Sequence, residues 1–83
     1  MDRDVQPSEL SLIFRANLKN RRKELGLSQH ELAEALGVTQ PCVAQLENGR
    51  RLPQLDTLAR YAEALATTPD ALLTPGIFSP ASN

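Results

Sequence analysis

The pattern of hydrophobic and polar positions is most regular between residues 28 and 51, where it predicts two short helices separated by a tight turn. Ser28 stands before the first apolar run and Glu31 follows three residues later, the spacing of a capping box that satisfies first-turn backbone amides. The first of these helices ends before Gly37, a residue that can adopt a positive φ without steric cost. Three residues share its inward face: Leu32, Ala33 and Leu36.

The second short helix is predicted from Thr39, which can act as its N-cap, to the pair Asn48 and Gly49. Pro41 fits in its first turn, where a backbone N–H would have no intrahelical partner. The intervening turn is so short that the helices must cross steeply, as in a helix-turn-helix unit. Val43 and Leu46 point inward and leave an outward face of Gln40, Pro41, Ala44, Gln45 and Asn48. Amides suit base edges because they both donate and accept, as adenine requires.

A longer helix is predicted before this unit. It begins near Ser8 or Ser11, either of which can cap it, and ends before Gly26. Successive positions along its inward side are Leu10, Ile13 or Phe14, Leu18, Arg21 or Arg22, and Leu25.

Two more helices are predicted after the unit. One covers about residues 54–66, with Tyr61 at the edge of its apolar stripe and the Tyr61 hydroxyl in water. The last is short and follows Thr68, a good N-cap, with Pro69 at its first position. The apolar stripe of the helix over residues 54–66 comprises Leu55, Leu58, Ala59, Ala62 and Leu65.

These segments predict one all-α domain of five helices over residues 8–74, with a flexible arm over 1–7 and a tail over 75–83. A chain of 83 residues buries only about 60% of its unfolded surface, so dimerisation would help to stabilise it. Neither a membrane-spanning run nor a signal peptide is recognised, so a cytoplasmic location is expected. Cys42 is the only cysteine, which excludes an intramolecular disulfide and a cysteine-rich zinc site.

The charge of the chain is unevenly distributed. The net charge is −1 and the isoelectric point about 5.7, which is not the basic balance of many nucleic-acid binders. Residues 15–51 nevertheless contain seven basic and four acidic side chains, whereas both flanking segments are net negative. This distribution favours a protein that meets phosphates with one face.

At LKNRRKELGLSQHELAEALGVTQ, QLENGRRLPQLDTL and PDALL, from about Leu18 to Leu73, the chain resembles the helix-turn-helix domains of lambdoid phage repressors and Cro proteins. This is the xenobiotic-response-element or Cro/CI type. The resemblance implies a five-helix lambda-repressor-like fold and a transcriptional regulator, expected to be a repressor. Such a protein would bind a palindromic operator in double-stranded DNA as a homodimer, with the helix over residues 39–48 in the major groove.

The resemblance also implies roles for individual residues. Arg22 and Glu47 would form a structural ion pair between the first and third helices. Independently of the resemblance, Lys19, Arg21 and Lys23 are either solvated or close to phosphates, and Cys42 is either a small side chain near DNA backbone phosphates or a redox sensor. The implied base-reading residues are Gln40, Pro41, Ala44 and Gln45. The implied phosphate contacts are Ser28, Gln29, Cys42, Asn48, Arg50 and Arg51, each of which could instead be an ordinary solvated or capping residue.

The dimer surface is expected in the last helix and the tail, because an exposed Ile-Phe pair in a small protein is usually covered. The residues concerned are Leu72, Leu73, Ile77 and Phe78. Phage repressors, restriction-modification controllers and antitoxins all fit this pattern. The alternative is a protein-interaction adaptor or antitoxin module whose main partner is a protein such as a toxin.

An enzyme is disfavoured by the residue pattern. The sequence has no paired carboxylates, no nucleophile with a base and no phosphate-cradling glycine loop. His30 is the only histidine and has no cluster of Cys or carboxylate ligands near it, so neither a metal nor a cofactor is expected.

Overall fold

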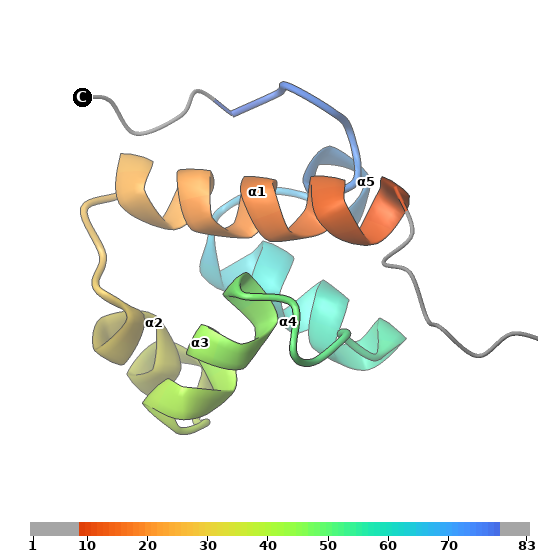
Figure 1. Cartoon of the computed structure of the whole chain (residues 1–83). Coiled ribbons are helices and arrows are strands. Elements are labelled where there is room, and N and C mark those ends of the chain that lie inside the picture. Colours follow the sequence, from red (N-terminus) through yellow and green to blue (C-terminus); the bar gives the residue numbers. More distant parts are fainter. Residues whose placement is uncertain (1–8, 79–83) are drawn as a thin grey trace, which may run out of the picture.

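The computed structural model describes residues 9–78, and within this range the chain is entirely helical apart from turns and loops (Figure 1). The predicted arm and Ser8 lie outside the described residues, as does the tail beyond Phe78. The five predicted helices are confirmed: α1 (Glu9–Glu24), α2 (Gln29–Leu36), α3 (Gln40–Glu47), α4 (Leu55–Ala64) and α5 (Pro69–Leu72).

The helices pack around one core. α1 lies across one side of the bundle and contacts α3 and α5, while α2 contacts both α3 and α4 (Figure 1). After α5 the chain turns back over α1 (Figure 1). The α2 and α3 core residues are the predicted ones: Leu32, Ala33, Leu36, Val43 and Leu46.

The inward faces of α1 and α4 differ from those predicted. Leu10 is 52% exposed and Leu55 is 84% exposed, because each lies at the first turn of its helix, beyond the end of the core. Leu25 and Ala59 are exposed as well. On α1 the buried residues are Phe14, Asn17, Leu18 and Arg22; on and just after α4 they are Leu58, Tyr61, Ala62 and Leu65.

Tyr61 is a core residue, so the prediction that its hydroxyl is in water is wrong. Only 1% of the residue is exposed. Burial raises the Tyr61 pKa, and the nearby Cys42 thiol and Glu47 raise it further, because a buried phenolate is poorly solvated. The hydroxyl therefore remains protonated at neutral pH.

Stability should consequently fall at alkaline pH. The unfolded chain ionises Tyr61 at pH ~10, whereas the folded chain does so only at higher pH. The contribution of Tyr61 protonation to stability is therefore complete below pH ~10 and falls as the pH rises above this value. Urea unfolding of the wild type at pH 9 and pH 11 measures this loss. Tyr61→Phe should lose less stability than the wild type between these two pH values. An equal loss would show that the pKa of Tyr61 is not raised by folding.

Arginine side chains close the carboxyl ends of three helices. Arg15 donates to the Asn48 carbonyl at 3.1 Å, after α3, and Arg21 donates to the Leu65 carbonyl at 2.9 Å, after α4. Arg60 donates to the Leu36 carbonyl at the end of α2. These carbonyls have no intrahelical partner and carry the negative end of the helix dipole. Arg21 is therefore engaged within the fold, which disfavours the phosphate role considered for it.

Gly49 makes the contact of Arg15 possible. It has a φ of 83°, and a Cβ built on it would lie 2.5 Å from the Arg15 guanidinium carbon. A glycine is thus required here both by the backbone conformation and by the arginine beside it.

Asn17 joins α1 to the end of α5. It is 2% exposed, and its side-chain amide donates to the Leu72 and Thr74 carbonyls at 2.9 and 2.8 Å. Replacing Asn17 with alanine should cost about 2 kcal/mol of unfolding free energy, because both carbonyls lose a buried donor. Chemical denaturation measures this loss, with Asn20→Ala on the same helix as control. Equal stability of the two variants would contradict this role.

The residues predicted for a dimer surface are only partly accessible. Leu72 is 0% exposed and belongs to the core, so its assignment to a dimer surface is wrong. The short α5 turns this side chain inward against α1 and α4. Phe78 and Leu73 pack partly on the core, and the Arg21 guanidinium lies 5.5 Å from the Phe78 ring centroid. Ile77 remains 49% exposed.

Candidate nucleic-acid interface

The helix-turn-helix unit is built from the local signals in its sequence. The capping box is present: the Glu31 amide donates to Ser28 Oγ at 3.0 Å, and the Ser28 amide donates to Glu31 Oε1 at 2.8 Å. Gly37 ends α2 with a φ of 72°. Thr39 has N-cap geometry, but its side chain makes no capping hydrogen bond. The α2 amino end and the whole of α3 are thereby placed side by side.

The predicted ion pair connects α1 to the end of α3. Arg22 donates to the Glu47 carboxylate through Nε at 2.6 Å and through Nη2 at 2.9 Å. The two side chains are 8% and 4% exposed, and the third guanidinium nitrogen donates to the Leu27 carbonyl at 2.8 Å. A bidentate, largely desolvated pair of this kind defines one orientation of α3.

This pair continues outward through two glutamines to the surface. Gln29 Nε2 donates to Glu47 Oε1 at 3.0 Å, and Gln40 Nε2 donates to Gln29 Oε1 at 2.7 Å. We call the series Arg22, Glu47, Gln29 and Gln40 the polar chain. It restrains the exposed Gln40 side chain, yet leaves it one N–H donor and its oxygen acceptor. Those are the two groups that pair with the N7 and N6 atoms of adenine.

The other residues predicted to read bases lie along the same helix. Pro41 is exposed in the first turn of α3, where it presents an apolar ring and no N–H donor. Ala44 and Gln45 are half-buried on the following turns.

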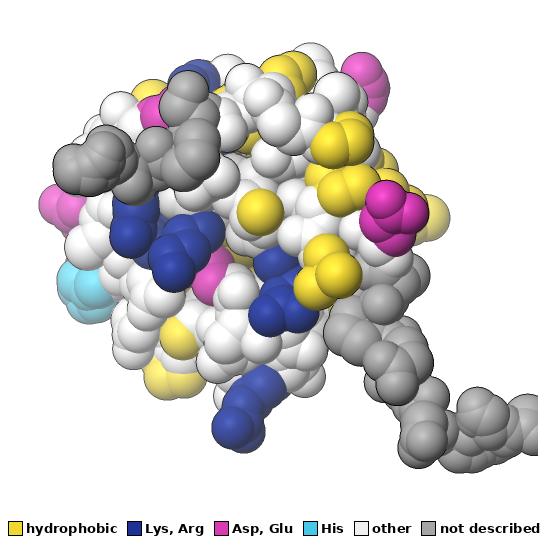
Figure 2. All heavy atoms as spheres, turned by 45° about the horizontal axis from the view of Figure 1, so that its top comes forward, with side chains coloured by type: hydrophobic (Ala, Val, Ile, Leu, Met, Phe, Trp, Pro, Cys, Tyr) yellow, Lys and Arg dark blue, Asp and Glu magenta, His cyan; other side chains and the backbone are white. Residues whose placement is uncertain are grey.

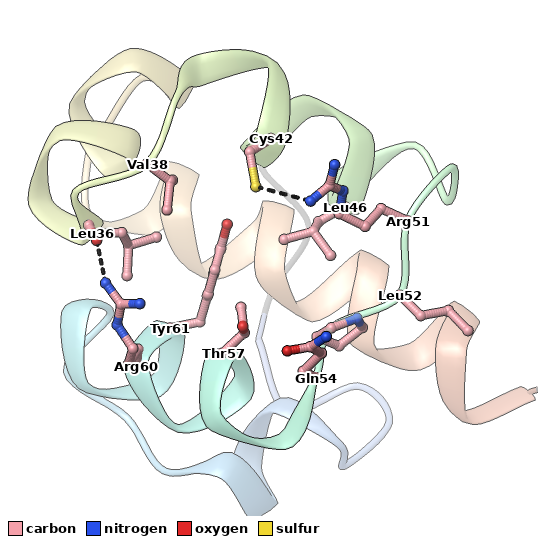
Figure 3. A pocket seen from close by; sticks show the side chains of 11 residues that line it. Leu36, Val38, Cys42, Leu46, Arg51, Leu52, Gln54, Thr57, Arg60 and Tyr61 are labelled. Atoms are coloured by element: carbon pink, nitrogen blue, oxygen red, sulfur yellow. Dashed lines mark hydrogen bonds between the residues drawn. The ribbon is translucent and has the colours of Figure 1, made fainter.

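The predicted phosphate-contacting residues fall into two groups with one exception. Ser28 and Gln29 lie at the amino end of α2, where free amides favour anions. Asn48, Arg50 and Arg51 are exposed after α3, and Asn48 Oδ1 accepts from the Arg50 amide at 3.0 Å. Cys42 is the exception, since its side chain points toward Arg51 on the inner side of α3 (Figure 3).

The basic centre of the chain is divided between structure and surface. Arg15, Arg21 and Arg22 make the internal contacts described above, while the exposed cations of this segment are Lys19, Lys23, Arg50 and Arg51. Lys and Arg side chains accordingly spread over the face shown in Figure 2, with apolar side chains gathered on the side where α1 begins. Two exposed arginines, Arg50 and Arg51, thus follow α3 directly, and the Arg51 guanidinium is turned toward Cys42.

The sequence did not reveal the position of Gln29 between Glu47 and Gln40. The available signal was that Gln29 and Gln40 occupy the first positions of two consecutive helices. Turning this signal into a contact requires the crossing of α2 and α3, which only the folded chain defines.

A short helix with exposed amides, held from behind by a buried ion pair and followed by exposed arginines, defines a helix-turn-helix DNA-binding domain. Comparison with known proteins agrees. The chain belongs to the Helix-turn-helix family, which matches residues 18–72.

Individual relatives extend this match. An uncharacterised helix-turn-helix-type transcriptional regulator of Methanothermobacter thermautotrophicus is 49% identical over 52 residues, 63% of this chain and 75% of that protein. The crystal structure of a hypothetical transcription factor from Neisseria is similar, with a TM-score of 0.79, 26% identity and coverage of 92% of this chain and 87% of that one.

A solved enzyme also contains a similar fold. Hydroxypropylphosphonic acid epoxidase from S. wedmorenis matches with a TM-score of 0.73 and 37% identity. The match covers 80% of this chain but only 35% of the epoxidase. Within residues 9–78, no helix is long and apolar enough to cross a membrane, and no three His, Cys, Asp or Glu side chains form a metal-binding group.

Proposed function

We propose that the chain is a transcriptional regulator that recognises a DNA sequence through α3 in the major groove. The polar chain is the observation that carries this proposal, since it restrains an exposed glutamine while leaving a free donor and a free acceptor. Gln40 reads a base edge in this arrangement, and Ala44 and Gln45 extend the contact. Pro41 contributes apolar contact, such as with a thymine methyl group.

Phosphate contacts give the same interface its affinity. Ser28 and Gln29 contact one DNA phosphate at the amino end of α2. The segment after α3 contacts the sugar-phosphate backbone of the DNA through Asn48, Arg50 and Arg51. The Cys42 side chain faces the protein interior, so this residue approaches the DNA backbone only through its main-chain atoms. Each arginine adds sequence-independent, salt-sensitive binding.

The experiment that tests this function is fluorescence anisotropy with duplex DNA from upstream of the gene and a scrambled duplex, each at two salt concentrations. Sequence-specific binding predicts tight binding to the native duplex and general weakening with salt. Equal, weak binding to both duplexes, together with a protein captured in a pull-down, would favour the adaptor or antitoxin alternative. The described residues act by binding in either case, and not as an enzyme.

The regulator acts as a repressor and homodimer in this proposal, with two half-sites about 34 Å apart on the operator. Ile77, which is 49% exposed, and the half-buried Leu73 and Phe78 form the contact after α5. Sedimentation velocity at micromolar concentration should show that Ile77→Asp is monomeric and that Leu55→Asp, on another exposed leucine, remains dimeric. The reverse result would move the dimer surface to the start of α4.

A further inference from the structure

A cavity of about 310 Å³ lies behind α3, between this helix, α4 and the end of α2 (Figure 3). Leu36, Val38 and Leu46 give it an apolar wall. Tyr61, Cys42 and Arg51 supply polar groups. This volume is at the lower end of the range for small-molecule sites, which typically combine an apolar lining with a few polar groups.

The Tyr61 hydroxyl is the strongest sign that the cavity accommodates a ligand. It points from α4 toward α3 within the cavity, and no described residue forms a hydrogen bond of normal geometry with it (Figure 3). The neighbouring Cys42 sulfur is at best a weak acceptor. A buried hydroxyl without a partner is unusual and costly. An oxygen atom placed in the cavity would satisfy it.

The charge of the lining indicates which kind of oxygen fits. Arg51 and Arg60 line the cavity, and no Asp or Glu does. Arg60 donates to the Leu36 carbonyl, whereas the Arg51 guanidinium makes only a long contact, from Nη1 to Cys42 Sγ at 3.9 Å, among the described residues. Arg51 therefore has donors available, and a negatively charged acceptor is favoured over a neutral one.

We propose that this cavity binds a small monocarboxylate with a compact apolar body. The carboxylate accepts hydrogen bonds from the Tyr61 hydroxyl and the Arg51 guanidinium, while the apolar body contacts Leu36, Val38 and Leu46. Cys42 and Leu46 belong to α3, so the bound molecule touches the DNA-reading helix from behind. Binding also neutralises Arg51, so the ligand weakens DNA binding; this last consequence rests on the function proposed above.

The chain provides its own reporter for binding. Tyr61 is the only tyrosine and there is no tryptophan, so tyrosine emission comes from the cavity alone. Cyclohexanecarboxylate and the uncharged cyclohexylmethanol are suitable probes, because both are transparent where tyrosine absorbs. The carboxylate should change the emission saturably and bind about tenfold more tightly than the alcohol. No saturable change, or equal binding of the two probes, would overturn the proposal.

Variants separate the cavity from nonspecific binding. Arg51→Gln should weaken carboxylate binding about tenfold and leave alcohol binding unchanged, whereas Lys23→Gln, an exposed cation outside the cavity, should have no effect on either. Tyr61→Phe, followed by two-dimensional NMR because the fluorophore is lost, should also weaken the carboxylate. Equal effects of Arg51→Gln and Lys23→Gln would show nonspecific attraction and refute the site.

A second measurement distinguishes the regulatory step from binding. Cyclohexanecarboxylate at saturation should lower the affinity for the native duplex in the anisotropy assay, and cyclohexylmethanol at the same concentration should not. If the DNA affinity is unchanged while the Tyr61 emission changes saturably, the proposed regulation of DNA binding is refuted and the carboxylate site is still supported. Absence of any DNA binding would refute the proposed function, while the emission titration would still decide the site.

Discussion

Gln40→Ala is expected to remove most of the preference for the native duplex over the scrambled one. In the proposed complex the glutamine supplies both a donor and an acceptor to one base edge, and such a pair contributes about 1–3 kcal/mol of discrimination. Binding to the scrambled duplex and its dependence on salt should change little, because the phosphate contacts remain. Anisotropy titrations of both duplexes measure the ratio of the two affinities.

Two further variants make this result specific to the polar chain. Gln54→Ala is a matched control, because Gln54 is exposed and makes no side-chain capping bond. Gln29→Ala should lower the preference partially, since Gln29 accepts the hydrogen bond that restrains Gln40. A Gln40→Ala variant that keeps the wild-type ratio of affinities would show that α3 reads DNA through other residues, or not at all.

Glu47→Ala is expected to be the most destabilising single change, with a loss of about 3 kcal/mol of unfolding free energy. It leaves the Arg22 guanidinium, whose side chain is 8% exposed, without its bidentate partner. It also removes the acceptor of Gln29 Nε2. Urea denaturation followed by circular dichroism measures the loss.

A double variant, Arg22→Met with Glu47→Leu, separates the stability lost by leaving one buried charge unpaired from the stability that depends on packing at this position. Replacing a buried ion pair by apolar residues of similar size is often neutral or stabilising, so most of the lost stability should return. The preference for the native duplex should not return, because Gln29 and Gln40 have lost their anchor. A loss below about 1 kcal/mol in Glu47→Ala alone would show that the pair is solvated and does not orient α3.

The local elements of this chain could be read directly from its sequence. The capping box at Ser28, the positive φ of Gly37 and the cap at Thr68 each involve residues no more than a few positions apart. Interactions of this range depend on the backbone of a single turn and hardly on the rest of the fold. The amide face of α3 followed from the same reasoning, once the inward residues were subtracted.

The interactions that connect distant segments were not available from the sequence. Arg21 caps a helix 44 residues further along the chain, and Asn17 donates to a carbonyl 55 residues away. In the sequence, Arg21 could be an inward-side residue, a solvated cation or a phosphate contact, and no pattern singled out Asn17. Only the crossing of α1 over α4 and α5 determines which carbonyls lie within their reach.

The same division explains the errors and the findings at the site. Periodicity placed Tyr61 at the edge of a stripe, because it ranks the faces of one helix without knowing what covers them. Leu72 was assigned to a dimer surface from the nearby Ile-Phe pair, and the sequence does not show that α5 packs this leucine into the core. The helices, the helix-turn-helix unit and the amide face of α3 followed from local sequence. The burial of Tyr61, the polar chain and the cavity behind α3 depend on how helices pack, and packing joins residues that the sequence leaves far apart.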